Sequence, residues 1–444
     1  MRTFLENTVI VVLDDDPTGT QTVHDVPVLT TWEEDTLEEM FRADTPLFYI
    51  LTNSRAFSEE VAVAMNEEIG GRLKKLGDKY QRRVLPISRS DSTLRGHYPA
   101  EVEALAEGFG ATNPLVFIIP AFIEGGRVTV DGVHYLEQEG VRTPVSETPF
   151  AKDPVFGYAN SDLTEWVVEK AAGTIRHEQI KKVGRTDLTG AALAETANRV
   201  ADPAYKVVVA DAESYEDLAR VADLIRRVQE LGRDVIIRSA ASIVKTLGNL
   251  EAAPLLEATD LLDVQNKRGG LVVVGSFVPL TTRQVSILMD RVSLPAYIIN
   301  TKQVVADPEE YVATLASKVR EHIESGETVL VYTQRKLQTG ANREENIQIG
   351  MQYSDLLVKL VQQIDVPPAF VVAKGGITSS DIATKGLGIR KAMVKGQIIP
   401  GVSVWEPGLD SRLSGFPYVV FPGNVGNDQA LYEVVKKLLG NFEL

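Results

Sequence analysis

Several residue types and motifs are absent from the chain, and each absence narrows its chemistry. The 444 residues include no cysteine, which excludes disulfide bonds, thiolate metal sites and a cysteine nucleophile. No apolar run approaches the about 20 residues that a membrane-spanning helix needs. The five histidines form neither an HExxH motif nor a pair at metal-ligand spacing. A GxxxxGK(S/T) loop, a GxGxxG after the first strand and a GxSxG elbow are all missing.

Net positive charge is also lacking. The formal net charge is -15 at pH 7, which argues against nucleic-acid binding through a broad basic face. An acidic protein that handles an anionic substrate must gather its arginines locally, so basic residues beside turns become informative. Acidic residues follow the first apolar segment too early for a signal peptide. We therefore expect a cytoplasmic protein with neither a nucleic-acid nor a membrane partner.

What is present is a repeated pattern of strand, turn and helix. Near-continuous apolar strands alternate with longer periodic segments, which indicates parallel sheets covered by helices on both faces. The strands are predicted at residues 9–13, 47–51, 84–87, 116–119, 206–210, 235–237, 271–274, 297–299, 329–332, 370–372 and 418–421. Between residues 307 and 326, Asp307 as cap, Pro308 at the first position and Gly326 at the end predict a helix.

The chain is too long for one ordinary core. Residues 249–270 look like a junction, because a helical stretch gives way to a charged, glycine-ended segment before a new strand. The fold class is therefore predicted as α/β, with two domains, 1–255 and 268–444, each built on a mostly parallel sheet flanked by helices. Residues 122–154 show weak periodicity, and a structureless loop of that length is uncommon unless it is functional.

Polar clusters follow four predicted strands of the first half, where ligands bind in open α/β sheets. These clusters occupy residues 14–19, 52–55, 88–97 and 120–127. Arginine suits a carboxylate or phosphate, whereas aspartate and asparagine suit sugar hydroxyls. Any one cluster could be ordinary turn chemistry, but four in register favour a pocket for a small hydroxylated anion.

The first cluster supports two interpretations. Asp14, Asp16 and Thr18 have the spacing of a HAD-type phosphatase, with Asp14 as the nucleophile. The overlapping Asp15, Asp16, Thr18 and Gly19 could instead bind a polyol substrate and a metal-bound phosphate. No convincing later acidic pair supports the phosphatase, which would also leave the glycine-rich second half unexplained.

The second half has three glycine turns at strand ends. They lie at residues 274–277, 374–381 and 421–428. Paired glycines let backbone N–H groups approach a phosphate, so these turns fit a nucleotide site. A simple helix cap made by Thr378 and Asp381 is the alternative for the middle turn.

Together these residues resemble the four-carbon acid sugar kinases, which use ATP to phosphorylate threonate, erythronate or their 3-oxo forms. Strings typical of that family occur in its order along nearly the whole chain, at residues 15–19, 91–96, 120–132, 147–154, 275–276, 282–284, 375–379, 400–402 and 423–426. The chain departs from the family where Phe421-Pro422-Gly423 replaces the usual Lys-Ser-Gly and Val274-Gly275-Ser276 the usual Ser-Gly-Ser. Its insertion at residues 21–25 is also longer than usual.

The resemblance implies an N-terminal sugar-acid domain, a C-terminal nucleotide domain and an active site in the cleft between them, with ATP and Mg²⁺ as cofactors. The acceptor is expected to be a terminal hydroxyl of the sugar acid, activated by Asp16 or Asp91 as catalytic base. Substrate binding is assigned to Asp15, Thr18, Arg55, Arg89, Ser92, Thr93, Arg95 and Arg127. Nucleotide binding is assigned to Ser276, Gly375, Gly376, Thr378, Ser379, Gly423 and Asn424. Metal ligands are not identified, a homodimer is compatible with the sequence, and a catalytically inactive sugar-acid binding protein is a further alternative.

Overall fold

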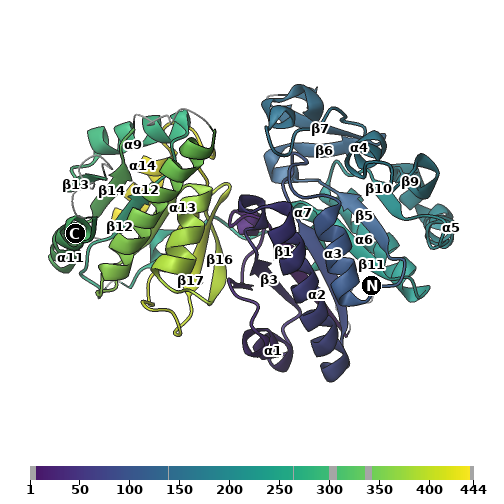
Figure 1. Cartoon of the computed structure of the whole chain (residues 1–444), viewed down its shortest axis with the longest axis horizontal. Coiled ribbons are helices and arrows are strands. Elements are labelled where there is room, and N and C mark those ends of the chain that lie inside the picture. Colours follow the sequence, from purple (N-terminus) through teal and green to yellow (C-terminus); the bar gives the residue numbers. More distant parts are fainter. Residues whose placement is uncertain (1–6, 139, 264, 300–307, 336–342, 441–444) are drawn as a thin grey trace. The chain divides into compact units, whose positions relative to one another are not determined.

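The computed structural model describes residues 7–138, 140–263, 265–299, 308–335 and 343–440. The chain forms two compact units (Figure 1). Unit 1 comprises Met1–Val23 and Thr31–Ala252, and unit 2 comprises His24–Thr30 and Ala253–Leu444. The domain limits 1–255 and 268–444 stay a prediction. Asp307, the expected helix cap, lies outside the described residues.

Unit 1 is built on a parallel sheet whose strands are almost wholly buried. Each strand pairs in parallel with its neighbours, as expected for near-continuous apolar runs. The spatial order is β3 (Leu47–Leu51), β1 (Thr8–Asp14), β4 (Arg83–Arg89), β11 (Val235–Ser239), β5 (Leu115–Ile119), β10 (Val207–Ala210) and β9 (Ile180–Val183).

Helices connect these strands and cover the sheet. In Figure 1, α2 and α3 lie side by side in front of it, and these two helices pack closely together. The helices of unit 1 are α1 (Glu34–Arg42), α2 (Glu59–Tyr80), α3 (Ala100–Phe109), α4 (Leu163–Lys170), α5 (Gly190–Val200), α6 (Tyr215–Glu230) and α7 (Ala241–Leu247). The connections through α2 and α3 lead from β3 towards β5, whereas those through α5 and α6 lead back from β9 towards β11. Because such crossovers are right-handed, the two pairs of helices lie on opposite faces of the sheet.

The segment with weak sequence periodicity is not structureless. It forms a small antiparallel sheet of β6 (Arg127–Val130), β7 (Val133–Gln138) and β8 (Val141–Pro144). Backbone hydrogen bonds between Thr129 and Ala212 attach this sheet to the segment that follows β10. Its short strands carry many polar residues, which explains why the sequence pattern was weak.

Unit 2 is built on a mixed sheet. Its parallel strands are, in spatial order, β13 (Ala296–Ile299), β14 (Val329–Thr333), β12 (Leu271–Val274), β15 (Val371–Lys374) and β18 (Tyr418–Phe421). Three antiparallel strands extend it, namely β17 (Val402–Pro407), β16 (Lys391–Ile399) and β2 (Val26–Leu29). The ladder between β2 and β16 is the reason that His24–Thr30 belongs to unit 2.

Helices flank this second sheet as well. They are α8 (Ala258–Leu261), α9 (Pro279–Arg291), α11 (Pro308–Glu324), α12 (Arg343–Gln363), α13 (Gly376–Asp381) and α14 (Ala430–Leu439), with one π-helical turn at Ile382–Gly386. Helix α9 packs on α14, and α11 packs on α12. A buried core under α9 and α14 includes Val285, Leu288 and Leu431 against Val274 and Phe421.

The predicted α/β class, with two mostly parallel sheets flanked by helices, is confirmed by this architecture. Helix α11 occupies the predicted stretch, and its Leu315 and Val319 side chains are buried. Among the described residues, no helix is long and apolar enough to cross a membrane.

Candidate functional site

The carboxyl ends of the neighbouring strands β1, β3 and β4 bring the first three predicted clusters together. Asp14, the last residue of β1, is in register with Leu51 on one side and with Arg89 on the other. Side chains that follow these three strands therefore meet at one edge of the sheet, which is where parallel α/β proteins bind ligands.

Asp14 is the most deeply buried carboxyl of this cluster. Its Oδ1 atom lies 3.0 Å from Nη1 of Arg89. A Cβ atom at Gly19 would come within 1.8 Å of the Asp14 carboxylate, so the turn after β1 closes tightly over it. Burial raises the pKa of Asp14 to about 7, although Arg89 opposes the shift.

Asp16 is held by Arg55 and Thr18. Nη2 of Arg55 and the Thr18 hydroxyl donate to its carboxylate, and the Thr18 amide donates to Oδ1 over 2.8 Å. Burial raises the pKa of Asp16, but Arg55 and Thr18 outweigh burial, so the pKa lies below its usual value. Asp16 is thus an anion whose side chain keeps 21% exposure.

Asp91 is the second anion with an accessible side chain. Nε of Arg95 lies 2.9 Å from its Oδ2 atom, and Nη1 of Arg55 lies 3.5 Å from its Oδ1 atom. The Thr93 hydroxyl and amide also donate to Oδ2. Burial opposes the charged form, yet Arg55 and Arg95 hold the pKa of Asp91 well below its usual range.

Asp15 lies between these groups with its hydrogen-bonding capacity only partly used. Ser90 donates its hydroxyl to Oδ2 over 2.6 Å, whereas Oδ1 is buried without a hydrogen-bond partner among the described residues. Nη1 of Arg55 and Nε of Arg89 are likewise buried and make no hydrogen bond there, although Nη1 of Arg55 is in ion-pair range of Asp91. Unpaired buried donors and acceptors are costly, and a hydroxylated anion is a ligand that could pair with them.

Arg127 behaves differently from the other predicted arginines. Its guanidinium donates to the carbonyl of Gly125 and lies 5.8 Å from the ring of Phe122. Burial lowers its pKa, and the Asp91 carboxylate partly offsets this effect. Arg127 therefore lies near Asp91, but its described hydrogen bond is made within its own turn.

Two residues that support this site were missed in the sequence. Arg238 of β11 is almost fully buried, and its Nη2 atom donates to the carbonyls of Asp91 and Arg95 over 3.3 Å. His134 of β7 lies with Nε2 2.8 Å from the Ser92 carbonyl. Burial lowers the pKa of His134 to about 4, so the ring is neutral and donates from one nitrogen.

The signal for Arg238 was a single arginine inside the apolar strand Val235–Ser239, because an unpaired charge is rarely buried. His134 had no comparable signal. It lies in a strand that the sequence pattern did not reveal, so its role depends on the tertiary structure.

In unit 2 the three glycine turns meet at Ser276 and Thr378. A Cβ atom at Gly275 would lie 2.2 Å from the Thr378 hydroxyl, and one at Gly423 would lie 2.8 Å from the Ser276 hydroxyl. Gly375 has a φ of +123°, and its added Cβ would lie 3.0 Å from both side chains. The glycines therefore let the three turns close around the Ser276 and Thr378 side chains, and glycine-rich turns are typical of sites where backbone approaches a phosphate.

The remaining predicted nucleotide residues divide into buried and accessible ones. The Ser379 side chain is fully buried, and its hydroxyl donates to the carbonyl of Gly375. Gly376 is partly exposed, and Asn424 is exposed. Ser379 thus shapes the turn from within, whereas Gly376 and Asn424 are open to a ligand.

Lys374, directly before the paired glycines, was not included among the predicted site residues. The structure places its side chain in the interior, against the turn that follows β18. The sequence feature that could have identified Lys374 is its place in Lys374-Gly375-Gly376, where a cationic residue ends an apolar strand directly before the paired glycines.

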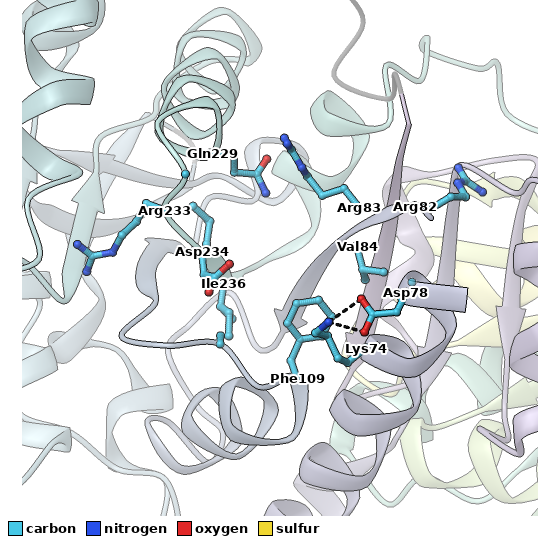
Figure 2. A pocket seen from close by; sticks show the side chains of 14 residues that line it. Lys74, Asp78, Arg82, Arg83, Val84, Phe109, Gln229, Arg233, Asp234 and Ile236 are labelled. Atoms are coloured by element: carbon cyan, nitrogen blue, oxygen red, sulfur yellow. Dashed lines mark hydrogen bonds and ion pairs between the residues drawn. The ribbon is translucent and has the colours of Figure 1, made fainter. Parts of the chain in front are cut away.

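A separate hollow of about 320 Å³ lies at the opposite, amino-terminal edge of the unit 1 sheet (Figure 2). Two of its cations have partners of their own. Nζ of Lys74 lies 2.5 Å from Asp78, and Arg233 donates to the carbonyls of Ala201 and Tyr205. This hollow contains none of the predicted site residues, so we assign it no part in the chemistry.

The described residues fit a nucleotide better than they fit a metal ion. The close-packed glycine turns of unit 2 suit a polyphosphate. Within the described ranges, no group of three His, Asp or Glu side chains is arranged to hold a metal. Mg²⁺ is usually bound by a few carboxylates and the nucleotide phosphates, so no chemical step is derived from a protein-bound metal.

Comparison with known proteins matches two parts of the chain to two named domains. A model of a sugar-binding N-terminal domain matches residues 10–247, which is more than half of the chain. A model of a nucleotide-binding C-terminal domain matches residues 271–431. The chain belongs to the four-carbon acid sugar kinase family. No curated protein matches its sequence.

Solved structures support the fold of this family member. A Salmonella typhimurium LT2 protein, named as a candidate tRNA synthase, is 16% identical with a TM-score of 0.71. The match covers 96% of this chain and 98% of that protein. Haemophilus influenzae protein HI1011 is also 16% identical, with a TM-score of 0.65, and the match covers 97% and 100%. At this identity the likeness concerns the fold alone.

Proposed function

We propose that the chain is an ATP-dependent kinase that phosphorylates a terminal hydroxyl of a four-carbon sugar acid such as threonate, erythronate or a 3-oxo form. The observation that carries this proposal is the cluster of arginines and aspartates at the carboxyl edge of the unit 1 sheet. It holds buried donors and acceptors that make no hydrogen bond among the described residues, in a domain of the sugar-binding family. The glycine turns of unit 2 provide the second substrate site that a kinase needs.

The arginines would bind the carboxylate of the sugar acid. Arg55 and Arg95 keep 18% and 25% side-chain exposure and so can reach a ligand. Arg89 lies deeper and stabilises Asp14 and Asp15. Planar guanidinium groups suit a carboxylate because they can donate two parallel hydrogen bonds.

Asp91 is the better candidate for the group that accepts the proton of the attacking hydroxyl. Both oxygens of Asp16 are occupied by Thr18 and Arg55. Oδ2 of Asp91 is similarly occupied, but its Oδ1 atom has only the Arg55 contact at 3.5 Å. In phosphoryl transfer such a carboxylate mainly orients the hydroxyl, so a low pKa does not disqualify it.

Polar backbone and small side chains of unit 2 would hold the nucleotide. The candidates are Ser276, Gly375, Gly376, Thr378, Gly423 and Asn424, of which Gly375 and Thr378 are buried. ATP would supply the phosphoryl group. We assign Ser379 a supporting position, because its hydroxyl is used within the turn.

A phosphatase that uses Asp14 as the nucleophile is less well supported. Asp14 is 1% exposed, lies against Arg89 and is covered by Gly19. Its raised pKa also leaves a large fraction of the carboxyl protonated at neutral pH, and a neutral carboxyl is a poor nucleophile.

The proposal is tested by coupled ADP release with Mg-ATP and a panel of D- and L-threonate, D- and L-erythronate and their 3-oxo forms. ADP release that depends on one of these acids would support the kinase and name its substrate. Binding of a sugar acid without any ADP release would favour the inactive binding protein. If ATP does not bind at all, the assignment of the unit 2 site fails.

A further inference from the structure

Lys374 is a buried cation at the end of β15. Its side chain has no exposed surface. The Nζ atom donates to the Pro422 carbonyl over 2.6 Å and lies 3.4 Å from the Gly423 carbonyl. It also lies 3.8 Å from the ring centre of Phe421, which is in register with Lys374 on the neighbouring strand β18.

No carboxylate neutralises this amine among the described residues. Burial is the sole cause that shifts its pKa, which falls to about 7. Lysine is almost never fully buried unless it is paired, because removing an ammonium from water is costly. Carbonyl oxygens and one aromatic ring stabilise the cation only in part. The position therefore retains a costly group that an apolar residue of similar size could replace.

The amine lies where two of the glycine turns meet. Thr281 donates its hydroxyl to the same Gly423 carbonyl over 2.9 Å and lies 3.1 Å from the Ser276 hydroxyl. Gly423 in turn packs against Ser276, and Gly375 follows Lys374 directly. The buried charge is thus placed directly beneath the segments proposed to hold nucleotide phosphates.

We infer that Lys374 supplies the positive charge that attracts the polyphosphate of a nucleoside triphosphate, and that its amine takes up a proton when the nucleotide binds. This inference rests on the proposed nucleotide site. The Pro422-Gly423 turn covers the amine, so Lys374 would attract the phosphates across this turn without touching them. Charges in a buried, weakly polar environment are screened much less than charges at a surface. Lys374 is therefore a positioning residue that acts by electrostatics.

Other titratable groups around Lys374 have partners of their own. Strand β12 carries no charged residue. Asp381 of α13 pairs with Lys385 over 2.8 Å. Tyr418 on β18 donates to the Ser379 carbonyl, and Arg335 after β14 donates to the Ser276 carbonyl. Arg283 on α9 pairs with Asp428. Asp290 and Arg291 lie at the far end of α9. Lys374 is thus the group whose protonation a bound polyanion would change most.

The test is calorimetric titration of the full chain with Mg-ATP, without sugar acid, in two buffers of different ionisation enthalpy. For the wild type we expect uptake of most of a proton at pH 8 and of little at pH 6, because the free amine titrates at about 7. At pH 6, Lys374→Met should bind Mg-ATP at least about tenfold more weakly than the wild type. Its binding should also take up no proton at pH 8. Lys374→Arg should keep most of the affinity but lose proton uptake, since arginine stays protonated.

The matched control is Lys385→Met, which removes an exposed lysine that is paired with Asp381. It should bind nucleotide and take up a proton as the wild type does. Thermal unfolding without ligand would show whether each variant is folded.

Three outcomes separate this inference from the proposed function. Wild-type affinity and proton uptake in Lys374→Met would overturn the role of Lys374 and leave the nucleotide site intact. Nucleotide binding by the wild type with no proton uptake at pH 8 would overturn it without any variant. No binding of Mg-ATP by the wild type would overturn the nucleotide site, and the role of Lys374 with it.

Discussion

Asp14 and Asp91 belong to one cluster, yet their pKa values move in opposite directions. Burial dominates at Asp14 and raises its pKa to about 7. At Asp91 the nearby guanidinium groups of Arg55 and Arg95 outweigh burial and lower it. Environments that push the pKa values of neighbouring carboxyls apart are typical of functional sites. In such sites one carboxyl stays ionised for binding or catalysis and another stays largely neutral.

The first residue-scale prediction concerns the proton acceptor. Asp91→Asn should lower kcat about 100-fold or more, because the amide cannot accept the hydroxyl proton, with a smaller change in the KM for the sugar acid. The control is Asp223→Asn on α6, a partly exposed aspartate outside the cluster. Steady-state kinetics of ADP release would decide this, and near-normal turnover in both Asp91→Asn and Asp16→Asn would refute the assignment.

A second residue-scale prediction concerns pH and stability. The folded-state pKa of Asp14 lies above its unfolded value of 3.8. Its stabilising contribution is therefore fully present below about pH 4 and is lost as pH rises through about 7. Asp14→Asn removes this titration, so the wild type should lose stability relative to the variant by at most about 1.4 kcal/mol per pH unit between pH 4 and 7. Urea unfolding of both proteins at pH 5 and pH 8 measures this difference, and parallel pH profiles would contradict the prediction.

Among the elements of unit 2, the turns after β12, β15 and β18 pack closely against one another. Gly375 combines a φ of +123° with close contacts to Ser276 and Thr378. The glycines are needed there because the Ser276 and Thr378 side chains occupy the space in which a neighbouring turn would place a Cβ atom. The N–H groups of Gly275 and Gly375 donate to the carbonyls of Lys374 and Phe421, so a phosphate would use the N–H groups that begin α13.

The element-scale prediction is that Gly375→Ala weakens Mg-ATP binding about tenfold or more, because its Cβ would displace Ser276 or Thr378. Gly415→Ala is a matched control in the same unit. Gly415 also has a positive φ, +80°, but no atom lies within 4 Å of its added Cβ. Both variants carry the strain of a positive φ, but only Gly375→Ala also has a steric clash at the turns. A difference between their affinities for Mg-ATP therefore measures the clash. Equal losses of affinity would show that strain alone is responsible.

For the whole molecule, each unit is expected to bind its own ligand. A ligand at 100-fold excess over its Kd stabilises the folded state by about 2.7 kcal/mol. Mg-ATP and the sugar acid should therefore each raise the Tm of the wild type. Gly375→Ala should reduce the shift caused by Mg-ATP to about half or less and keep that caused by the sugar acid, whereas Arg95→Met should reduce only the shift caused by the sugar acid. Thermal unfolding with each ligand tests this, and loss of both shifts in either variant would argue against separate sites.

The sequence predicted the strands and the turns at their ends because both depend on local patterns. Apolar runs such as Val371–Lys374 mark buried strands, and Gly375-Gly376 marks the turn that follows. The small sheet of β6, β7 and β8 was not recognised, because its strands are short, partly exposed and rich in polar residues. Nor could local patterns assign residues 24–30 to unit 2, since that assignment follows from pairing with β16, more than 300 residues further along the chain.

The sequence by itself determined the fold class, the family and the groups of residues that could contact a ligand, because these follow from hydrophobic periodicity and from strings of adjacent residues. The tertiary structure decided which of those groups are accessible and how each is charged. It separates the covered Asp14 from the partly open Asp16 and Asp91, and it places Arg238 and Lys374 beneath the loops that would bind the substrates. Burial and electrostatic environment depend on neighbours far apart in the chain, so only the folded arrangement could decide them.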